Sequence, residues 1–125
     1  MMNSTNHWLN FVGGQWIDAT TTIEVDDPAT GKVFATIACA DANVVDQAVK
    51  AARACVDSGV LSDCRPVERA ALMRRIADEI RAIADKAAPL LAQENGKSLD
   101  DAREEFLMAA KYFEYYAGMA DKIEG

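Results

Sequence analysis

The sequence has few of the residue types from which compact chemical sites are built. It contains one histidine and three cysteines, and no two cysteines have C-x-x-C spacing. An odd number of cysteines without that spacing argues against a disulfide framework and against a structural zinc site. We therefore expect a reduced, cytoplasmic location.

Long apolar runs and an excess of basic charge are also missing. No stretch approaches the roughly 18–20 apolar residues of a membrane span, and the first ten residues lack the order of a signal peptide. The formal net charge is −7, from 13 Lys and Arg against 20 Asp and Glu. This acidity leads us to expect neither a nucleic-acid partner nor a membrane.

Common motifs of catalysis and nucleotide binding are absent too. The sequence contains no G-x-G-x-x-G, Walker, H-E-x-x-H or G-x-S-x-G pattern. Cys39, Cys55 and Cys64 have no histidine near them in the sequence to act as a base, so we interpret them as buried or incidental thiols. The acidic residues at 100–105 favour a helix N-terminus, with a paired acid/base role as the alternative.

The 125 residues that are present are half apolar, which is enough for one domain with a core. Gly13-Gly14 is a strong signal for a two-residue hairpin turn. The segment D-P-A-T-G at 27–31 has the chemistry of a second turn, since proline fixes φ and glycine allows positive φ. Strands are expected on either side of these turns, at residues 9–12, 15–18, 21–25 and 32–39.

After residue 40 the apolar pattern takes the period of a helix. We expect helices to begin at Asp41 and at Pro66. Pro89 should end the second helix near residue 84 and leave a short third helix, which Asn95-Gly96 then caps. Ser98 resembles the N-cap of a fourth helix. The apolar face of the second helix is expected at Leu72, Ile76, Ile80 and Ile83.

The last predicted helix carries more large apolar side chains than one helical face holds. We expect several of them to contact material beyond the preceding helices, because an uncovered patch of this size is a binding or aggregation surface. That material is either a partner chain or the remainder of the same chain. The side chains are Phe106, Leu107, Met108, Tyr112, Phe113, Tyr115, Tyr116 and Met119.

Five blocks of the sequence occur in a characteristic order. They are FVGGQWIDA, VDDPATGKVFATI, DANVVDQAVKAARACVDSG, VERAALMRRIADEIRAIADKAAPLLAQENGKSL and FEYYAGMADKIEG. In this order they resemble the N-terminal quarter of NAD(P)-dependent aldehyde dehydrogenases, from about Leu9 to Gly125. Asp27 stands where that family usually has asparagine, and Ser98 where it commonly has proline.

This resemblance implies an enzyme that oxidises an aldehyde to the carboxylic acid with NAD or NADP. A cysteine thiolate attacks the carbonyl, and a glutamate activates the water that hydrolyses the resulting thioester. The family's segments with the cysteine, the glutamate and the cofactor turn lie downstream of this stretch. We therefore assign no catalytic and no cofactor-binding residue, and expect an N-terminal fragment that is inactive by itself.

The resemblance also implies the fold and the partners. We expect an α+β chain with a flexible leader at 1–8, hairpins at 9–40 and helices at 41–122. Residues 9–125 would form an incomplete N-terminal portion of the α/β NAD-binding domain, in a full-length homodimer or homotetramer. The alternatives are a non-catalytic interaction or oligomerisation module derived from this family, and an unrelated α+β protein.

Two sets of site residues follow from the resemblance alone. Met108 and Tyr112 match positions that line the family's substrate entrance, with ordinary core packing as the alternative. Val25, Asp26 and Glu94 match a monovalent-cation site of some members. Glu94 stands where that site usually has aspartate.

Overall fold

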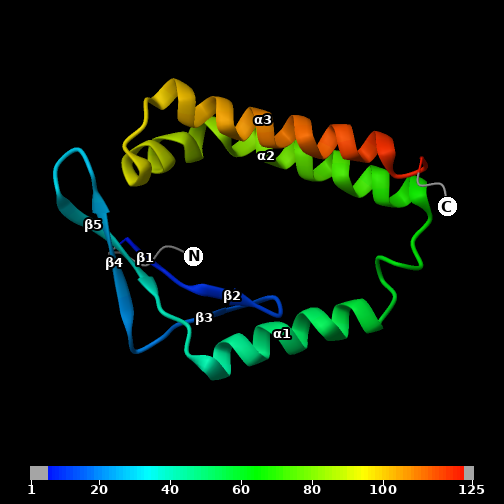
Figure 1. The fold of residues 1–125 in the computed structure, drawn as a ribbon, viewed down its shortest axis with the longest axis horizontal. Coiled ribbons are helices and arrows are strands. Elements are labelled where there is room, and N and C mark those ends of the chain that lie inside the picture. Colours follow the sequence, from blue (N-terminus) through cyan, green and yellow to red (C-terminus); the bar gives the residue numbers. More distant parts are fainter. Residues whose placement is uncertain (1–5, 123–125) are drawn as a thin grey trace. The chain divides into compact units, whose positions relative to one another are not determined.

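The computed structural model describes residues 6–122, which form two compact units that divide between Val60 and Leu61. The first unit contains the strands and one helix, and the second is a helical hairpin (Figure 1). The elements are β1 (His7–Trp8), β2 (Asn10–Val12), β3 (Gln15–Ile17), β4 (Thr22–Asp27), β5 (Lys32–Ala38), α1 (Ala42–Asp57), α2 (Pro66–Asn95) and α3 (Leu99–Met119).

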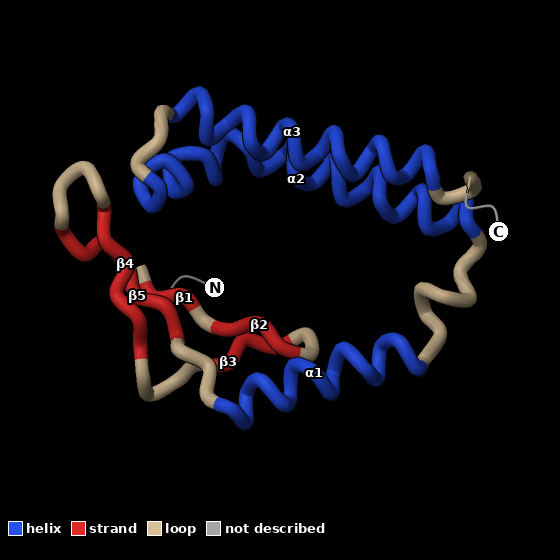
Figure 2. Tube along the Cα trace, in the orientation of Figure 1, coloured by secondary structure: helices blue, strands red, loops and turns tan. Residues whose placement is uncertain are grey.

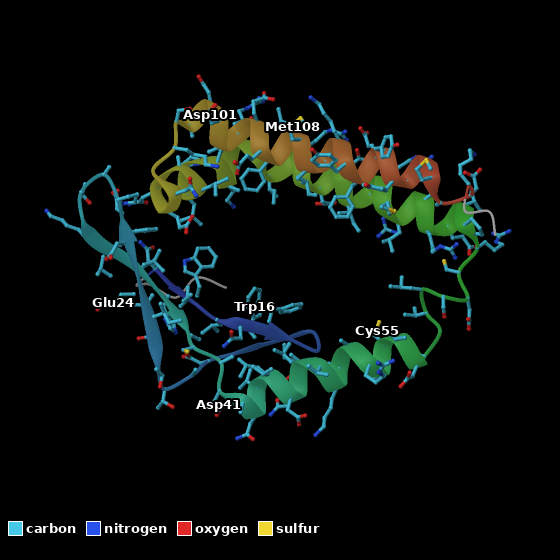
Figure 3. The ribbon with its side chains drawn as sticks, viewed as in Figure 1. Trp16, Glu24, Asp41, Cys55, Asp101 and Met108 are labelled. Atoms are coloured by element: carbon cyan, nitrogen blue, oxygen red, sulfur yellow. The ribbon has the colours of Figure 1, made fainter. Side chains whose placement is uncertain are left out.

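Strands β2 and β3 form the first predicted hairpin. They are antiparallel, and Gly13 and Gly14 connect them with φ of 57° and 85°. Positive φ at both central residues is what a type I′ turn requires, which explains the glycine pair. Phe11 and Trp16 are register partners, with ring centroids 4.9 Å apart, and Figure 3 labels Trp16 on this hairpin. The first hairpin prediction is confirmed.

Strands β4 and β5 form the second predicted hairpin within a three-stranded sheet of order β1-β5-β4. The Asp27 carboxylate accepts a hydrogen bond of 2.8 Å from the backbone N–H of Ala29, which stabilises the turn. Strand β1 pairs in parallel with β5. The leader predicted over residues 1–8 is therefore wrong for His7 and Trp8, while residues 1–5 lie outside the described residues.

Helix α1 begins where the sequence predicted. The Asp41 carboxylate accepts a hydrogen bond of 2.9 Å from the backbone N–H of Val44, as an N-cap residue does. A Cβ atom added to Gly13 would lie 3.6 Å from the Cβ of Ala51, so the β2–β3 turn approaches the helix closely. A small residue at each of these positions permits that approach.

The predicted break at Pro89 is wrong, because α2 continues through it to Asn95, and the described part of the chain has three helices rather than four (Figure 2). A proline inside a helix removes one backbone hydrogen bond and costs about 3 kcal/mol. The neighbouring residues Ala84 and Ala88 are buried. Their packing holds the helix together across the missing bond.

Helices α2 and α3 lie side by side and run in opposite directions (Figure 1). Their contact is built from small residues, and Ala70, Ala77 and Ala84 follow one another at intervals of seven. Because alanine side chains are small, the two helix backbones approach closely, and their facing surfaces are removed from water. The buried residues of this seam are Ala70, Ala77, Ala84 and Ala88 of α2 with Ala102, Ala110 and Ala117 of α3.

Ion pairs accompany the alanine seam along its length. Arg103 Nε lies 2.6 Å from an oxygen of Asp85. Further pairs join Arg81 to Glu114 and Lys97 to Glu105. Exposed pairs contribute little individually, so we regard them as features that favour this register of the two helices over others.

The turn between the helices has the predicted chemistry. Gly96 has a φ of 78° and ends α2, and the Ser98 hydroxyl accepts a hydrogen bond of 3.1 Å from the Asp101 backbone N–H at the start of α3.

Within residues 6–122, no helix has the length and apolar content needed to cross a membrane.

Candidate functional site

A stripe of large side chains runs along α3 on the side away from α2. Met108, Tyr112, Tyr115 and Met119 follow the spacing i, i+4, i+7, i+11, which places them on one helical face. Their side chains are between 42% and 64% exposed. Figure 3 shows Met108 on this outer side of the helix. We call these residues, together with Tyr116, the tyrosine face.

The tyrosine face contains a shallow hollow of about 360 Å³, lined by Lys111, Tyr112, Tyr115 and Tyr116. The rings of Tyr115 and Tyr116 meet edge to face, with centroids 5.2 Å apart and planes at 89°. The Lys111 ammonium lies 4.0 Å from the sulfur of Met108. The surface is therefore largely aromatic, with hydroxyl groups and one cation available to a binding partner.

The cysteines do not form a reactive centre in the described part of the chain. Cys39 and Cys64 are half-buried and Cys55 is exposed, and all three are free thiols. Burial and a hydrogen bond to Glu68 raise the pKa of the Cys64 thiol. A raised pKa keeps the thiol protonated, and a protonated thiol is a poor nucleophile.

The helix N-termini are occupied by acidic side chains. Asp41 accepts a backbone hydrogen bond in the first turn of α1, and Glu68 accepts one at the start of α2. The first turn of α3 contains Asp100 and Asp101. A dinucleotide pyrophosphate needs open backbone N–H groups and no competing negative charge. The N-termini of the three described helices therefore carry acidic side chains.

In the first unit, His7 forms side-chain hydrogen bonds that the sequence did not predict. His7 Nε2 is 2.9 Å from a carboxylate oxygen of Asp18, and His7 Nδ1 is 2.8 Å from the hydroxyl of Thr36. The partners are 11 and 29 residues away in the chain, so local spacing carries no signal for them.

Comparison with known proteins identifies the family. A family model described as the aldehyde dehydrogenase family matches residues 16–125. The chain belongs to the aldehyde dehydrogenase family. The resemblance inferred from the five sequence blocks is thereby confirmed.

Individual dehydrogenases support the assignment. The chain is 36% identical, over 123 residues, to aldehyde dehydrogenase family 2 member B4, mitochondrial, from Arabidopsis thaliana. An NAD-dependent aldehyde dehydrogenase from Sinorhizobium meliloti superposes with a TM-score of 0.88 at 34% identity. A betaine aldehyde dehydrogenase from Staphylococcus aureus, in complex with NAD+, superposes with a TM-score of 0.85 at 27% identity. The α+β fold expected from the sequence therefore matches the N-terminal part of aldehyde dehydrogenase structures.

The match covers nearly all of this chain and a small part of each relative. It includes 96% of the chain against the Arabidopsis enzyme, and 95% and 92% against the two structures. The same matches cover 23%, 24% and 24% of the relatives. The chain therefore spans about a quarter of the length of these dehydrogenases.

The two residues predicted at the dehydrogenase substrate entrance lie on the tyrosine face. Met108 and Tyr112 are one helical turn apart, and both are exposed. Neither side chain is buried among the described residues, and core packing stays the alternative. The entrance role stays a prediction. Tyr115 and Tyr116 share the face and were not among the predicted site residues, although the apolar spacing on this helix is a signal that points to Tyr115.

The predicted cation ligands come from separate units. Val25 and Asp26 lie in β4, where the pairing with β5 shifts register between them, and Asp26 is exposed. Glu94 is exposed in the last turn of α2. Within residues 6–122, no three His, Cys, Asp or Glu side chains are grouped so that they could hold a metal ion. The cation site stays a prediction.

Proposed function

We propose that this chain is the N-terminal part of an NAD(P)-dependent aldehyde dehydrogenase. The full-length enzyme oxidises an aldehyde to the carboxylic acid through a cysteine thiohemiacetal and a thioester. The observation that carries the proposal is the family match over residues 16–125, together with a TM-score of 0.88 to an NAD-dependent aldehyde dehydrogenase. The aldehyde and the cofactor bind to residues downstream of this stretch.

The role of this chain in the enzyme is structural. Its acidic helix N-termini do not fit the cofactor, and its cysteines lack an activating partner in the described part. The tyrosine face leaves large apolar side chains in water, and such faces are normally covered. We propose that residues 9–125 belong to the NAD-binding domain and that the rest of the enzyme covers this face.

The test compares two purified proteins, the 125-residue chain and the full-length enzyme. Each is mixed with a panel of aldehydes and with NAD+ or NADP+, and reduced cofactor is followed by absorbance. We expect reduction by the full-length enzyme only. Aldehyde-dependent reduction by the 125-residue chain would overturn the proposed structural role, and an inactive full-length protein would overturn the proposed enzyme.

A second candidate function is a non-catalytic module derived from the dehydrogenase family that mediates interaction or oligomerisation. The exposed tyrosine face is the observation that favours it. The reading frame beyond Gly125 separates the two candidates. Continuation into the family's cysteine, glutamate and cofactor segments supports the enzyme, and a stop codon with no further homologous sequence supports the module.

Assembly and location complete the proposal. We propose a homodimer or homotetramer of the full-length enzyme, which light scattering at several concentrations will measure. We also propose a cytoplasmic location, which the three free thiols support because reducing compartments maintain them. Cell fractionation tests the location, and recovery in an organelle would contradict it.

A further inference from the structure

Strand β1 is the shortest strand of its sheet and lies on an edge. Within residues 6–122 it pairs with Thr36 and Ile37 of β5, which has seven residues. The backbone N–H of Thr36 donates to the Asn6 carbonyl at 3.0 Å, and the Asn6 side chain donates to the Phe34 carbonyl at 2.9 Å. A strand of two residues makes few ladder hydrogen bonds, so its side chains contribute much of its attachment.

The His7 side chain makes the most extensive of these attachments. It is 15% exposed and bridges Thr36 on β5 to Asp18, which directly follows β3. A carboxylate only accepts hydrogen bonds, so Nε2 of His7 carries the proton directed at Asp18. The Thr36 hydroxyl donates to Nδ1 when the ring is neutral and accepts from it when the ring is protonated. The bridge therefore forms in both states of the imidazole.

We propose that His7 is a latch that holds β1 against the edge of β5, and that protonation of Asp18 by acid releases it. Protonation neutralises the carboxylate that accepts from Nε2 and leaves Thr36 as the other side-chain partner of His7, which weakens the attachment of β1. When β1 leaves, the edge of β5 presents unpaired backbone groups to which another strand can add. The latch is thus a conformational device that protects a sheet edge.

The direction of the pH dependence follows from Asp18. The hydrogen bond from His7, with a second from the Ala19 N–H, lowers the pKa of Asp18 below its ordinary value of 3.8. A lowered carboxylate pKa stabilises the folded state above the ordinary pKa, and this contribution disappears as the pH falls through the lowered pKa. The latch is therefore closed at neutral pH and opens in acid.

Other ionisable groups share this face of the sheet. Glu24 is the register partner of Thr36 on β4, and Asp26 lies two residues further along β4 on the same face, whereas the pair Asp27 and Lys32 lies on the opposite face. Glu24 is a carboxylate as well, so a pH profile alone does not identify Asp18. The Asp18→Asn variant separates the two, because it keeps the shape of the side chain and removes its titration.

Amide hydrogen exchange on the 125-residue chain tests the latch. The Thr36 amide bonds to Asn6 across β1, whereas the Cys39 amide bonds to Thr21 on the other side of the sheet and serves as the internal reference. We expect His7→Ala to raise Thr36 exchange about tenfold relative to Cys39, because both side-chain hydrogen bonds of His7 are lost. Thr36→Val, which removes only the hydroxyl, should give a smaller rise.

The pH dependence of the latch is tested with the same ratio of Thr36 to Cys39 exchange. In the wild-type chain the ratio should rise as the pH falls below about 4, and in Asp18→Asn it should be raised already at neutral pH and stay flat. An unchanged ratio in His7→Ala would overturn the latch. Equal acceleration of Thr36 and Cys39 would also overturn it, because His7 would then support the whole sheet rather than β1.

Discussion

Two glycines of the helical hairpin have opposite backbone requirements. Gly96 has a φ of 78° at the end of α2, a conformation that is unfavourable for residues with a Cβ atom. Gly118 lies inside α3, where an added Cβ would meet nothing within 4 Å. The same substitution should therefore change stability in opposite directions at the two positions.

We predict that Gly118→Ala raises the free energy of unfolding of the hairpin by about 0.5–1 kcal/mol, since alanine costs less conformational entropy in a helix. Gly96→Ala should lower it by about 1 kcal/mol, because alanine is strained at positive φ. Urea unfolding followed by helical circular dichroism measures both. Equal effects of the two variants would show that the backbone conformations are not as described.

At the scale of residues, the sequence predicted interactions between near neighbours. The caps at Asp41 and Ser98 bond to backbone groups three residues away, so local pattern was enough to find them. His7 was missed because its partners Asp18 and Thr36 become neighbours only when the sheet forms. The sequence therefore revealed interactions between residues close in the chain and missed those between residues far apart in it.

At the scale of elements, Pro89 is the residue on which our expectation and the structure differ most. The helix continues through it, so the loss of one backbone hydrogen bond and the steric clash of its ring are present in the folded state. Pro66 is the matched control, because at the first helical position the missing N–H has no partner to lose.

We predict that Pro89→Ala raises the free energy of unfolding of the α2–α3 hairpin by about 1–3 kcal/mol, as the hydrogen bond to the carbonyl of residue 85 is restored. Pro66→Ala should change it by less than about 0.5 kcal/mol. Urea unfolding with helical circular dichroism measures both variants. A destabilised Pro89→Ala would mean that the ring makes packing contacts that outweigh the backbone defect.

The buried side of α2 was also predicted differently from what is observed. The large residues Leu72 and Ile83 marked the expected face, yet both are exposed while the alanines between α2 and α3 are buried. Hydrophobic periodicity favours large side chains, because they gain most from burial. Close approach of two helices instead selects small side chains, and that selection depends on the partner helix.

At the scale of the whole molecule, the described residues bury no apolar side chain larger than alanine. The exposed large side chains include Phe11, Trp16 and the tyrosine face. A patch of this kind binds apolar dyes when it is left uncovered. Dye binding to the tyrosine face can be measured directly, because Tyr112, Tyr115 and Tyr116 are each more than half exposed.

We predict that replacing both Tyr112 and Tyr115 by serine lowers the fluorescence of the apolar dye ANS bound to the 125-residue chain by about half or more. Helical circular dichroism should be unchanged, since both rings are more than half exposed. Leu99→Ser is the control, because it removes one apolar side chain that is 54% exposed and lies away from this face. Unchanged dye binding in the double variant would contradict a binding surface there.

The sequence by itself determined the family, the two hairpins, the helix caps and the absence of catalytic motifs. All of these depend on residues that are neighbours in the chain or on blocks read in order. The tertiary structure decided that α2 continues through Pro89, that alanines form the helix contact, and that His7 joins Asp18 and Thr36. The physical reason is common to the three, since each depends on packing between segments that only folding brings together.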